Sequence, residues 1–440
     1  MADVAPFKGV LYNQELIHNL DDVTAPPYDV ISPQEQEAFY AKHPNNVIRL
    51  ILGKPEPGDA GVSSIHHRAA AYFKQWMKDR ILIQDSQAAF YLTTVDFSIS
   101  GQNVTRYGII GTVRLEPFDK GIILPHERTF SKVKSERLQL MKACHANFSP
   151  IFGLYPDGNG VLGKLKNAAE SRRPDLTMAD HKGLLHKLWR ITDPQSQHHI
   201  ATSLKDQSIY IADGHHRYET ALNYRSWAAQ HVNHFHADHP ANFVMMSLSS
   251  LKDPGMVICP AHRLLKAVSS DDASAMLEKA AQYFSIREFG IGQDPDQAFA
   301  ALEAAMTANA SRNAIGVYIK NRSALRMLVL KEGVMEALFG QELEAPLRDL
   351  DVSVLTRLLM MELLGFDQAR LDDATKIGYA TTVSDAVKAV RENAADMAFL
   401  LNPTRMEQVQ RVAQQGLIMP RKSTYFYPKV GSGIVFNLLN

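Results

Sequence analysis

Segments with the hydrophobic pattern of helices alternate with strand-like segments along most of this chain. Residues 64–79 carry apolar side chains at helical spacing, which predicts a helix. Residues 89–97 and 107–115 are rich in β-branched and aromatic residues, and Ser100-Gly101-Gln102-Asn103 supplies a turn between them, which predicts a β-hairpin. No solenoid repeat or low-complexity tract interrupts the alternation. We therefore expect a mixed α/β (α+β) fold built from packed layers.

The same alternation continues through the second half of the chain. Residues 259–331 predict strand, helix, strand, helix and two further strands, which we interpret as a separate α/β subdomain. Beyond it we expect helices at 351–364 and 403–414 and strands at 375–380 and 397–401. A chain of 440 residues is long for one hydrophobic core, so more than one domain is expected.

Charge and cysteine content exclude several classes of protein. Basic and acidic residues are equal at 47 each, so no global field attracts nucleic acid or an anionic membrane. The two cysteines, Cys144 and Cys259, suggest neither a disulfide framework nor a zinc thiolate cage. The N-terminus has no signal-peptide pattern, and apolar stretches are shorter than the roughly 20 residues of a spanning helix. We expect a cytoplasmic protein without a membrane partner.

The motif Asp213-Gly214-His215-His216-Arg217 stands between a predicted strand at 208–212 and a predicted helix at 217–229. Glycine lets the backbone approach a ligand closely, and the start of a helix attracts an anion. Arg217 adds a planar fork suited to phosphate, and Asp213 could hold a metal ion that bridges phosphates. The alternative is that Asp213 caps the helix and both histidines are polar residues of its exposed first turn.

A second motif, Pro125-His126-Glu127-Arg128-Thr129, precedes a predicted helix that contains Glu136 and Arg137. A carboxylate beside cations in a pocket can act as a general base toward a hydroxyl, and Glu127 is the candidate. The alternative is a solvated loop held by surface ion pairs.

Two more segments are candidates for substrate contacts. Residues 419–429 bring cations, hydroxyls and aromatic rings together and could clamp a phosphate or carboxylate, or they form a tail strand with extended lysines. Residues 25–32 contain a proline turn that could fix Tyr28 and Asp29. The alternative is a structural turn in which Ser32 caps a helix beginning at Pro33.

The string His234-Phe235-His236-Ala237-Asp238-His239 matches the ligand pattern of binuclear zinc hydrolases. That pattern normally follows a buried strand, whereas here it follows a predicted helix and ends at Pro240. We therefore favour a surface loop over a metal site formed by His234, His236, Asp238 and His239.

These motifs together resemble the family known as domain of unknown function 1015. The segments that carry the resemblance lie at residues 6–9, 25–31, 46–50, 125–129, 211–218, 400–403 and 419–429. The Asp-Gly-His-His-Arg box is also similar to that of free-serine kinases of the ParB/sulfiredoxin-like superfamily. In those small kinases the His-Glu pair lies closer to the box, so an insertion at roughly residues 144–204 is expected here.

The resemblance implies a nucleotide-dependent phosphotransferase, a kinase acting on free serine or a similar small hydroxyl compound. It implies Mg²⁺ and ATP or ADP as cofactors, with Asp213 as metal ligand, and it favours magnesium over zinc. Glu127, Asp213, His215 and His216 would be catalytic, and Gly214, Arg217, His126 and Arg128 would bind phosphate. The residues expected to bind substrate are Tyr28, Asp29, Lys422, Ser423, Thr424, Tyr425 and Lys429.

Four segments are predicted on this basis: an N-terminal α/β segment at 1–120, a ParB/sulfiredoxin-like catalytic core with the insertion at 121–258, the α/β subdomain at 259–340, and a C-terminal α/β segment at 341–440 that completes the site. Three other functions stay open: a phosphatase or nucleotide hydrolase for phosphoserine-like compounds, a nucleotide-gated ParB-like binding module, and a zinc metallohydrolase. The zero net charge argues against a nucleic-acid partner. Substrate identity, phosphate donor and oligomeric state are not readable from the sequence.

Overall fold

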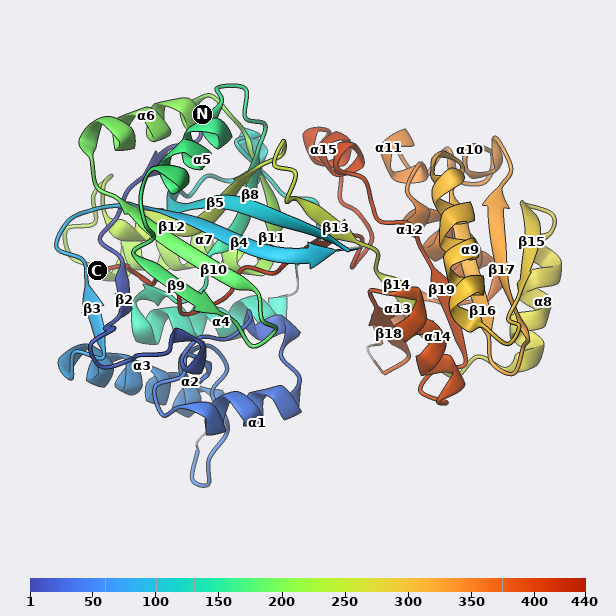
Figure 1. Cartoon of the computed structure of the whole chain (residues 1–440), viewed down its shortest axis with the longest axis horizontal. Helices are drawn as coiled ribbons and strands as arrows, with labels where there is room; N and C mark the ends of the chain where they lie inside the picture. Colours follow the sequence, from blue (N-terminus) through green and yellow to red (C-terminus); the bar gives the residue numbers. More distant parts are fainter. Residues whose placement is uncertain (60, 100, 130, 374) are drawn as a thin grey trace. The chain divides into compact units, whose positions relative to one another are not determined.

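The computed structural model describes residues 1–440 except 60, 100, 130 and 374, and these residues form two compact units. Unit 1 comprises residues 1–125, 129–257 and 428–440, and unit 2 comprises residues 126–128 and 258–427. The chain passes from unit 1 to unit 2 in β13 (Val257–Cys259) and returns directly after β20 (Tyr425–Tyr427). Figure 1 shows both units, with most of their helices and strands labelled.

A mixed sheet of nine strands organises unit 1. Its order is β6-β11-β8-β12-β5-β4-β10-β9, with β1 pairing on β5. β11 runs parallel to β6 and antiparallel to β8, and β12 runs parallel to β8 and antiparallel to β5. The strands are β1 (Val4–Ala5), β4 (Phe90–Ile99), β5 (Gln102–Arg114), β6 (Ile123–Leu124), β8 (Ile151–Tyr155), β9 (Leu176–Ala179), β10 (Leu185–Ile191), β11 (Ile209–Asp213) and β12 (Phe243–Ser250).

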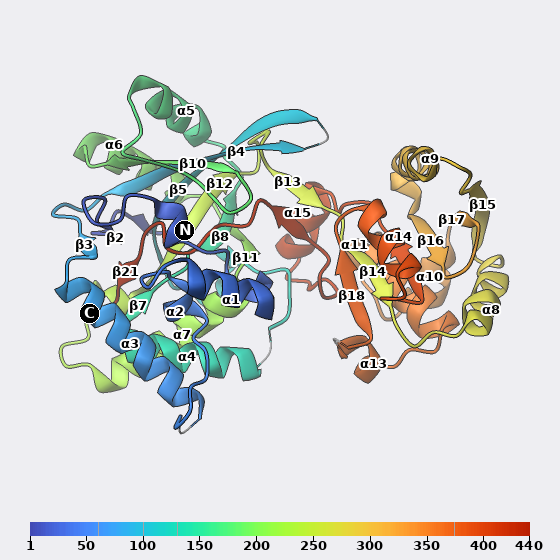
Figure 2. The same cartoon turned by 60° about the horizontal axis from the view of Figure 1, so that its bottom comes forward.

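Helices cover both faces of this sheet. Figure 2 shows α5 (Val161–Ser171) and α6 (Pro194–Lys205) on one side and α3 (Val62–Lys78), α4 (Ser131–Cys144) and α7 (His215–His231) on the other. α4 packs against both α3 and α7. The remaining elements of unit 1 are α1 (Pro33–Lys42), α2 (Ile48–Ile51), β2 (Val10–Tyr12) paired with β3 (Leu82–Gln84), and β7 (Ala146–Asn147) paired with β21 (Asn437–Leu438).

An antiparallel sheet of six strands organises unit 2, in the order β15-β17-β16-β19-β14-β18. Alternate residues of β19 serve opposite faces, because successive side chains of a strand point to opposite sides. Met397 and Phe399 pack with α8 (Ser270–Ala280) and the π-helix η6 (Val354–Leu363), whereas Ala398 and Leu400 pack with α9 (Pro295–Ala308) and α14 (Val383–Arg391). The strands are β14 (His262–Leu265), β15 (Phe284–Gly290), β16 (Ala314–Ile319), β17 (Ala324–Leu330), β18 (Ile377–Ala380) and β19 (Met397–Leu400).

Two of the predicted helices of unit 2 differ from expectation. The helix predicted at 351–364 is a short α12 (Asp351–Ser353) followed by η6 (Val354–Leu363), and the helix predicted at 403–414 begins only at Met406. The other helices are α8 (Ser270–Ala280), α9 (Pro295–Ala308), α10 (Val334–Phe339), α11 (Ala345–Arg348), α13 (Gln368–Asp372), α14 (Val383–Arg391) and α15 (Met406–Gln414).

The mixed α/β class and most predicted elements are confirmed. The predicted hairpin forms, with Tyr91 opposite Ile110, and of its turn only Ser100 lies outside the described residues. The four predicted segments, however, are grouped by strand pairing into two units. In unit 1, β4 and β5 of the predicted segment 1–120 pair with β10 and β12 of the predicted segment 121–258. In unit 2, β19 of the predicted segment 341–440 lies between β16 and β14 of the predicted segment 259–340. The stretch at 144–204 is also more than an insertion, because it supplies the interior strand β8.

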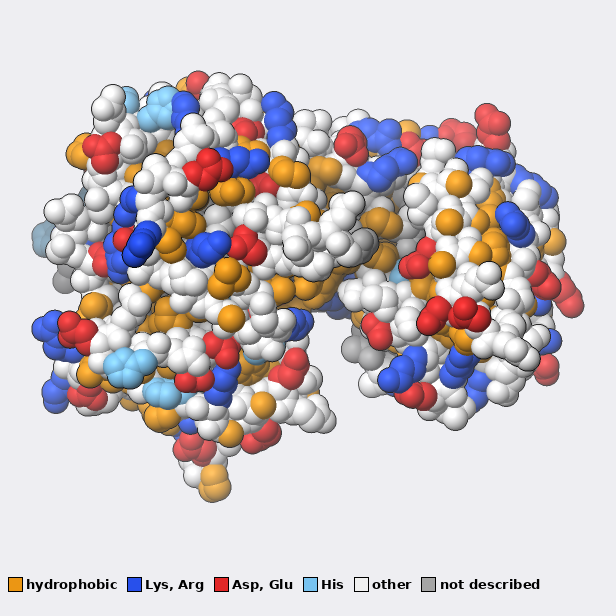
Figure 3. Space-filling view, viewed as in Figure 1, with side chains coloured by type: hydrophobic (Ala, Val, Ile, Leu, Met, Phe, Trp, Pro, Cys, Tyr) orange, Lys and Arg blue, Asp and Glu red, His pale blue; other side chains and the backbone are white. Residues whose placement is uncertain are grey.

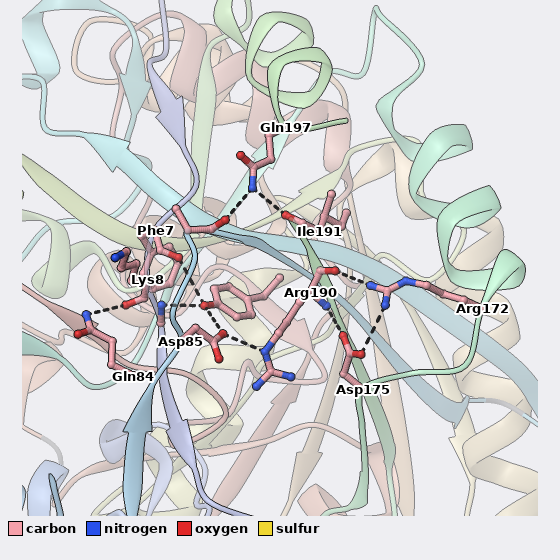
Figure 4. Close-up of polar contacts among 12 residues, drawn as sticks. Phe7, Lys8, Gln84, Asp85, Arg172, Asp175, Arg190, Ile191 and Gln197 are labelled. Atoms are coloured by element: carbon pink, nitrogen blue, oxygen red, sulfur yellow. Dashed lines mark hydrogen bonds and ion pairs between the residues drawn. The ribbon is translucent and has the colours of Figure 1, made fainter. Parts of the chain in front are cut away.

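Residues 6–9 anchor the N-terminus to the sheet through a polar network (Figure 4). The Gly9 amide donates to the Tyr91 hydroxyl over 2.7 Å, and that hydroxyl donates to Asp85 over 2.9 Å. Arg190 also donates to Asp85, over 2.9 Å. A Cβ atom on Gly9 would lie 2.4 Å from the Tyr91 hydroxyl oxygen. Glycine at this position therefore permits the close approach that the network needs.

No helix within the described residues is long and apolar enough to span a membrane. On the face seen in Figure 3, basic and acidic side chains are intermixed, as the equal numbers of the two in the sequence would suggest.

We predict that Gly9→Ala lowers the free energy of unfolding by about 1–3 kcal/mol, because the new methyl group clashes with a buried tyrosine. Urea denaturation followed by circular dichroism measures the change. Gly163→Ala is the control, since a Cβ there meets nothing within 4 Å and the position is helical. Equal stability of the two variants would contradict the assigned packing.

Candidate functional site

The loop between β11 and α7 depends on a glycine. Gly214 has φ +93° and ψ +28°, a left-handed conformation that L side chains rarely adopt. A Cβ atom on it would lie 2.8 Å from Nε and 2.9 Å from Cζ of Arg217. The absence of a side chain thus lets the guanidinium fold back against the loop and sets the direction in which α7 begins.

The carboxylate of Asp213 forms ion pairs with two cations of unit 1. Its Oδ2 lies 2.5 Å from Nη2 of Arg217, and its Oδ1 contacts the ammonium of Lys429. Arg217 also donates through Nη1 to the carbonyl of Pro150. The three charged side chains are only 12–14% exposed. This Asp213 cluster, defined as Asp213, Arg217 and Lys429, has a formal charge of one positive unit.

Electrostatics keep the Asp213 carboxylate ionised. Burial acts to raise its pKa, but the cations of Lys429 and Arg217 outweigh burial and hold the pKa well below the usual range. Tyr28 belongs to the same environment: burial raises the pKa of its hydroxyl, and Arg217 opposes the rise. Asp213 is therefore an anion at physiological pH, and Tyr28 keeps its proton.

The interpretation of Asp213 as a helix cap is wrong. Gly214 is the N-cap of α7, and no side chain among the described residues caps the helix there. The carboxylate oxygens of Asp213 are directed to Arg217 and Lys429 instead. Of the two histidines, His215 is buried at 3% exposure, so it is not a polar residue of an exposed first turn, and His216 is half-buried. The positive end of the helix dipole adds to the charge of the cluster.

The predicted residues His126, Glu127 and Arg128 belong to unit 2. His126 is 1% exposed, its Nε2 lies 3.0 Å from Oγ1 of Thr424, and its carbonyl accepts from the Met419 amide over 2.9 Å. Burial lowers the pKa of Arg263, and the charge of Glu127 acts against this lowering. Glu127 is therefore close to a buried arginine, as the interpretation of a carboxylate beside cations requires.

The predicted substrate segment at 419–429 is divided between the units. Lys422, Ser423, Thr424 and Tyr425 belong to unit 2, where Arg263 donates to the carbonyls of Arg421 and Lys422 over 2.9 Å each. Lys429 belongs to unit 1 and contacts Asp213. The buried Arg263 fixes the backbone at residues 421–422 in unit 2, and Asp213 fixes the side chain of Lys429 in unit 1.

The proline turn serves two purposes in unit 1. Ser32 accepts from the Glu35 amide and caps α1, as predicted for the structural alternative. Tyr28 lies under the guanidinium of Arg137, whose carbon is 4.4 Å from the ring centroid. Asp29 is exposed. Of the two residues predicted here to bind substrate, Tyr28 is mostly buried and feels the charges of Arg217 and Asp213, whereas Asp29 faces solvent.

The residues present do not make a ready metal site. Within the described residues no group of three or more His, Cys, Asp or Glu side chains is arranged to hold a metal ion. His239 accepts from the Ala241 amide over 3.1 Å and caps a short 3-10 helix (Pro240–Asn242), so its string of histidines supports a local turn. Both oxygens of Asp213 contact cations, which leaves this carboxylate poorly suited to Mg²⁺.

Several contacts around the cluster carry no signal in the sequence. Thr129 donates to Glu219 of α7 over 2.7 Å, and Lys134 pairs with the same carboxylate. Arg137, which the sequence placed only on a helix, reaches Tyr28 from α4. These contacts join residues from different helices and loops, so no local pattern could have indicated them.

A polar cluster in unit 2 fixes the segment at 400–403. Asp351 accepts from Asn313 over 2.8 Å and from Asn402 over 3.2 Å. Thr404 donates to the Ser423 carbonyl over 2.6 Å, which ties this segment to the one at 419–427. Burial raises the pKa of Asp351 to about 6.

Most of the chain matches a known protein family. Residues 4–353 match the model of the family described as "Protein of unknown function (DUF1015)". The chain belongs to the DUF1015 family. This confirms the family recognised from the motifs, although the motifs at 400–403 and 419–429 lie beyond the matched range. No curated protein matches this DUF1015 member.

Solved structures show only distant likeness. A free serine kinase determined in complex with AMP has 12% identity and a TM-score of 0.35, with 72% of this chain and 86% of that chain covered. A conserved hypothetical protein from Pyrococcus furiosus has 12% identity and a TM-score of 0.36, covering 74% and 94%. SbnI with a C-terminal truncation, from Staphylococcus aureus, has 11% identity and a TM-score of 0.32, covering 74% and 82%. Similarity of this extent does not identify a function.

We predict strong coupling between Asp213 and Lys429. A double-mutant cycle of Asp213→Asn and Lys429→Met should give a coupling free energy of about 1–3 kcal/mol, because the pair is buried. Denaturation with urea provides the four stabilities. The control cycle uses Lys388 and Glu392, which are 3.9 Å apart and 68% and 63% exposed, and should show no measurable coupling. Equal coupling in both cycles would refute the buried pair.

We also predict that Asp351 makes unit 2 less stable as the pH rises. Its folded-state pKa of about 6 exceeds the unfolded value of about 3.9, so the folded state binds the proton more tightly. The stabilising contribution is present below pH of about 4 and is lost as the pH rises to about 6, by up to about 3 kcal/mol. Asp351→Asn should lack this dependence. Parallel stability curves between pH 4 and 7 for both proteins would contradict the assignment.

Proposed function

We propose that this DUF1015 protein is a nucleotide-dependent phosphotransferase that acts on free serine or a similar small hydroxyl compound. The observation that carries the proposal is the Asp213 cluster at the start of α7. It combines a glycine turn, a helix N-terminus and two nearly buried cations, Arg217 from α7 and Lys429 from the C-terminal tail. These are the features that bind phosphoryl groups in proteins.

Charge in the cluster supports an anionic ligand. Within the cluster, Lys429 and Arg217 carry two positive charges against the one negative charge of Asp213. Arg217 has five N–H donors, and only two bonds to Asp213 and Pro150 are assigned to it. A phosphate beside the loop could accept further bonds without displacing Asp213. The proposed role of Asp213 is to hold both cations in position.

The other roles follow the resemblance to free-serine kinases. Glu127 would take the proton from the acceptor hydroxyl, and His126 and Arg128 would assist at the phosphate. His215 and His216 would act at the reacting phosphoryl group, together with the backbone of Gly214. Lys422, Ser423, Thr424 and Tyr425 would contact substrate.

The proposed enzyme uses a nucleotide as phosphate donor. A nucleotide would present its phosphates to the Gly214 turn, Arg217 and Lys429, and it would supply the phosphoryl group. The described residues give no argument for a protein-bound Mg²⁺, so no role in the reaction is assigned to one. The protein's own contribution is to orient the phosphates electrostatically and to accept one proton at Glu127.

A direct assay tests the proposal. Purified protein is incubated with L-serine and ATP or ADP, and O-phosphoserine is measured by mass spectrometry. Glu127→Gln should reduce turnover by about 100-fold or more, since it removes the base. Asp213→Asn should also reduce turnover strongly, because Arg217 and Lys429 lose the anion that positions them.

Asp238→Asn is the matched control for Asp213→Asn, because it makes the same chemical change at a side chain that is 86% exposed. It should retain wild-type turnover. Absence of O-phosphoserine with every donor would overturn the proposal. Release of phosphate from O-phosphoserine without nucleotide would identify a phosphatase instead. Circular dichroism establishes that each variant is folded.

A further inference from the structure

A small pocket in unit 1 lies directly beside Arg217. Its volume is about 70 Å³, far below the several hundred Å³ of sites for drug-sized ligands. Leu140, Met141, Phe148 and Ile151 give it apolar walls, and Arg137 and Arg217 supply its charges. None of the described lining residues is an aspartate or glutamate. We call it the Arg137 pocket.

Arg137 lines this pocket with a nearly buried side chain. The side chain is only 10% exposed, and Nη1 donates to the Ile51 carbonyl over 2.6 Å while Nη2 pairs with Glu136. The Nε atom is buried and has no hydrogen-bond partner among the described residues. A guanidinium has five N–H donors, and these two contacts use one donor each of Nη1 and Nη2. The second N–H groups of Nη1 and Nη2 are the donors that a ligand in the pocket would use.

Arg217 links the Arg137 pocket to the Asp213 cluster. Its guanidinium pairs with Asp213, while the same side chain lines the pocket. Tyr28 lines the pocket as well and stacks with Arg137 at 4.4 Å. The pocket and the cluster therefore share one arginine, and a small molecule in the pocket lies next to any phosphate held by the cluster.

We infer that the Arg137 pocket binds a small organic carboxylate, with the carboxylate accepting from Arg137 and Arg217. Arg137 and Arg217 pair with Glu136 and Asp213, which are not among the described lining residues, so the side chains that line the pocket itself include two guanidiniums and no carboxylate. Planar guanidiniums match a carboxylate well. The apolar walls favour an organic anion with a short carbon chain over inorganic phosphate. The volume of about 70 Å³ favours a compact ligand over a whole nucleotide. Ligands of two to four carbon atoms fit this description.

The inference also concerns the acceptor of the proposed reaction and in that respect rests on the proposed function. The acceptor would be recognised through its carboxylate. The described lining residues include no aspartate or glutamate that would select an ammonium group on the ligand. Small hydroxycarboxylates should therefore bind about as well as serine. A hydroxyl compound without a carboxylate should not.

Calorimetric titration of the wild-type protein tests the ligand class. L-Serine and D-glycerate should bind with similar affinity, and ethanolamine, which keeps the hydroxyl and the amine but lacks the carboxylate, should bind at least 10-fold more weakly. Equal binding of ethanolamine and serine would overturn the inference.

Variants then locate the site. Arg137→Gln should weaken glycerate binding at least 10-fold. Arg137→Lys keeps the charge but not the planar fork, so its affinity for glycerate should lie between those of the wild-type protein and Arg137→Gln. Arg173→Gln, at an exposed arginine, is the matched control. Unchanged affinity in folded Arg137→Gln would refute the site. If Arg137→Gln does not fold, the lysine variant and the wild-type ligand series decide.

The two proposals fail separately. Carboxylate binding that depends on Arg137, without any phosphorylated product, keeps the pocket and overturns the phosphotransferase. Phosphorylation of ethanolamine at the rate of serine keeps the phosphotransferase and overturns the carboxylate pocket.

Discussion

Asp213 lies where three distant parts of unit 1 meet. Through Arg217 it positions the first turn of α7 and the Pro150 carbonyl before β8, and through Lys429 it holds the returning C-terminal tail. Without this carboxylate, two nearly buried cations would lack their counter-charge, which is among the costlier defects in a protein interior. The loop geometry, the end of the tail and the charge of the candidate site all depend on one side chain.

Local patterns predicted the elements around this residue well. The hydrophobic stripe of α3, the β-branched composition of β4 and β5, and the junction of β11 with α7 are each contained in short stretches of sequence. Strand order was not predictable in the same way. β19 joins β16 and β14 across long sequence separations, and those pairings are decided by burial on both faces of the sheet. The predicted boundary at residue 340 therefore does not correspond to a boundary between the units.

The candidate site shows the same limit. The spacing of Asp213 and Arg217 on the first turn of a helix is visible in the sequence, and so is the turn that requires Gly214. The sequence also marked Lys429, but only as a substrate ligand, because nothing local shows that the tail returns to β11. Arg137 was missed for a related reason. Its importance comes from its place in the pocket lining and a stacked Tyr28, and both arise from packing between separate elements.

The path of the chain has a consequence for how the protein is made. Residues 428–440 complete unit 1: β21 pairs with β7, Phe436 is fully buried, and Lys429 contacts Asp213. These residues follow every residue of unit 2 along the chain, so they are synthesised after it. All residues of unit 2 are therefore available for folding before unit 1, which begins first, receives the segment that closes its core. Until residues 428–440 are added, the apolar surfaces that they cover stay open.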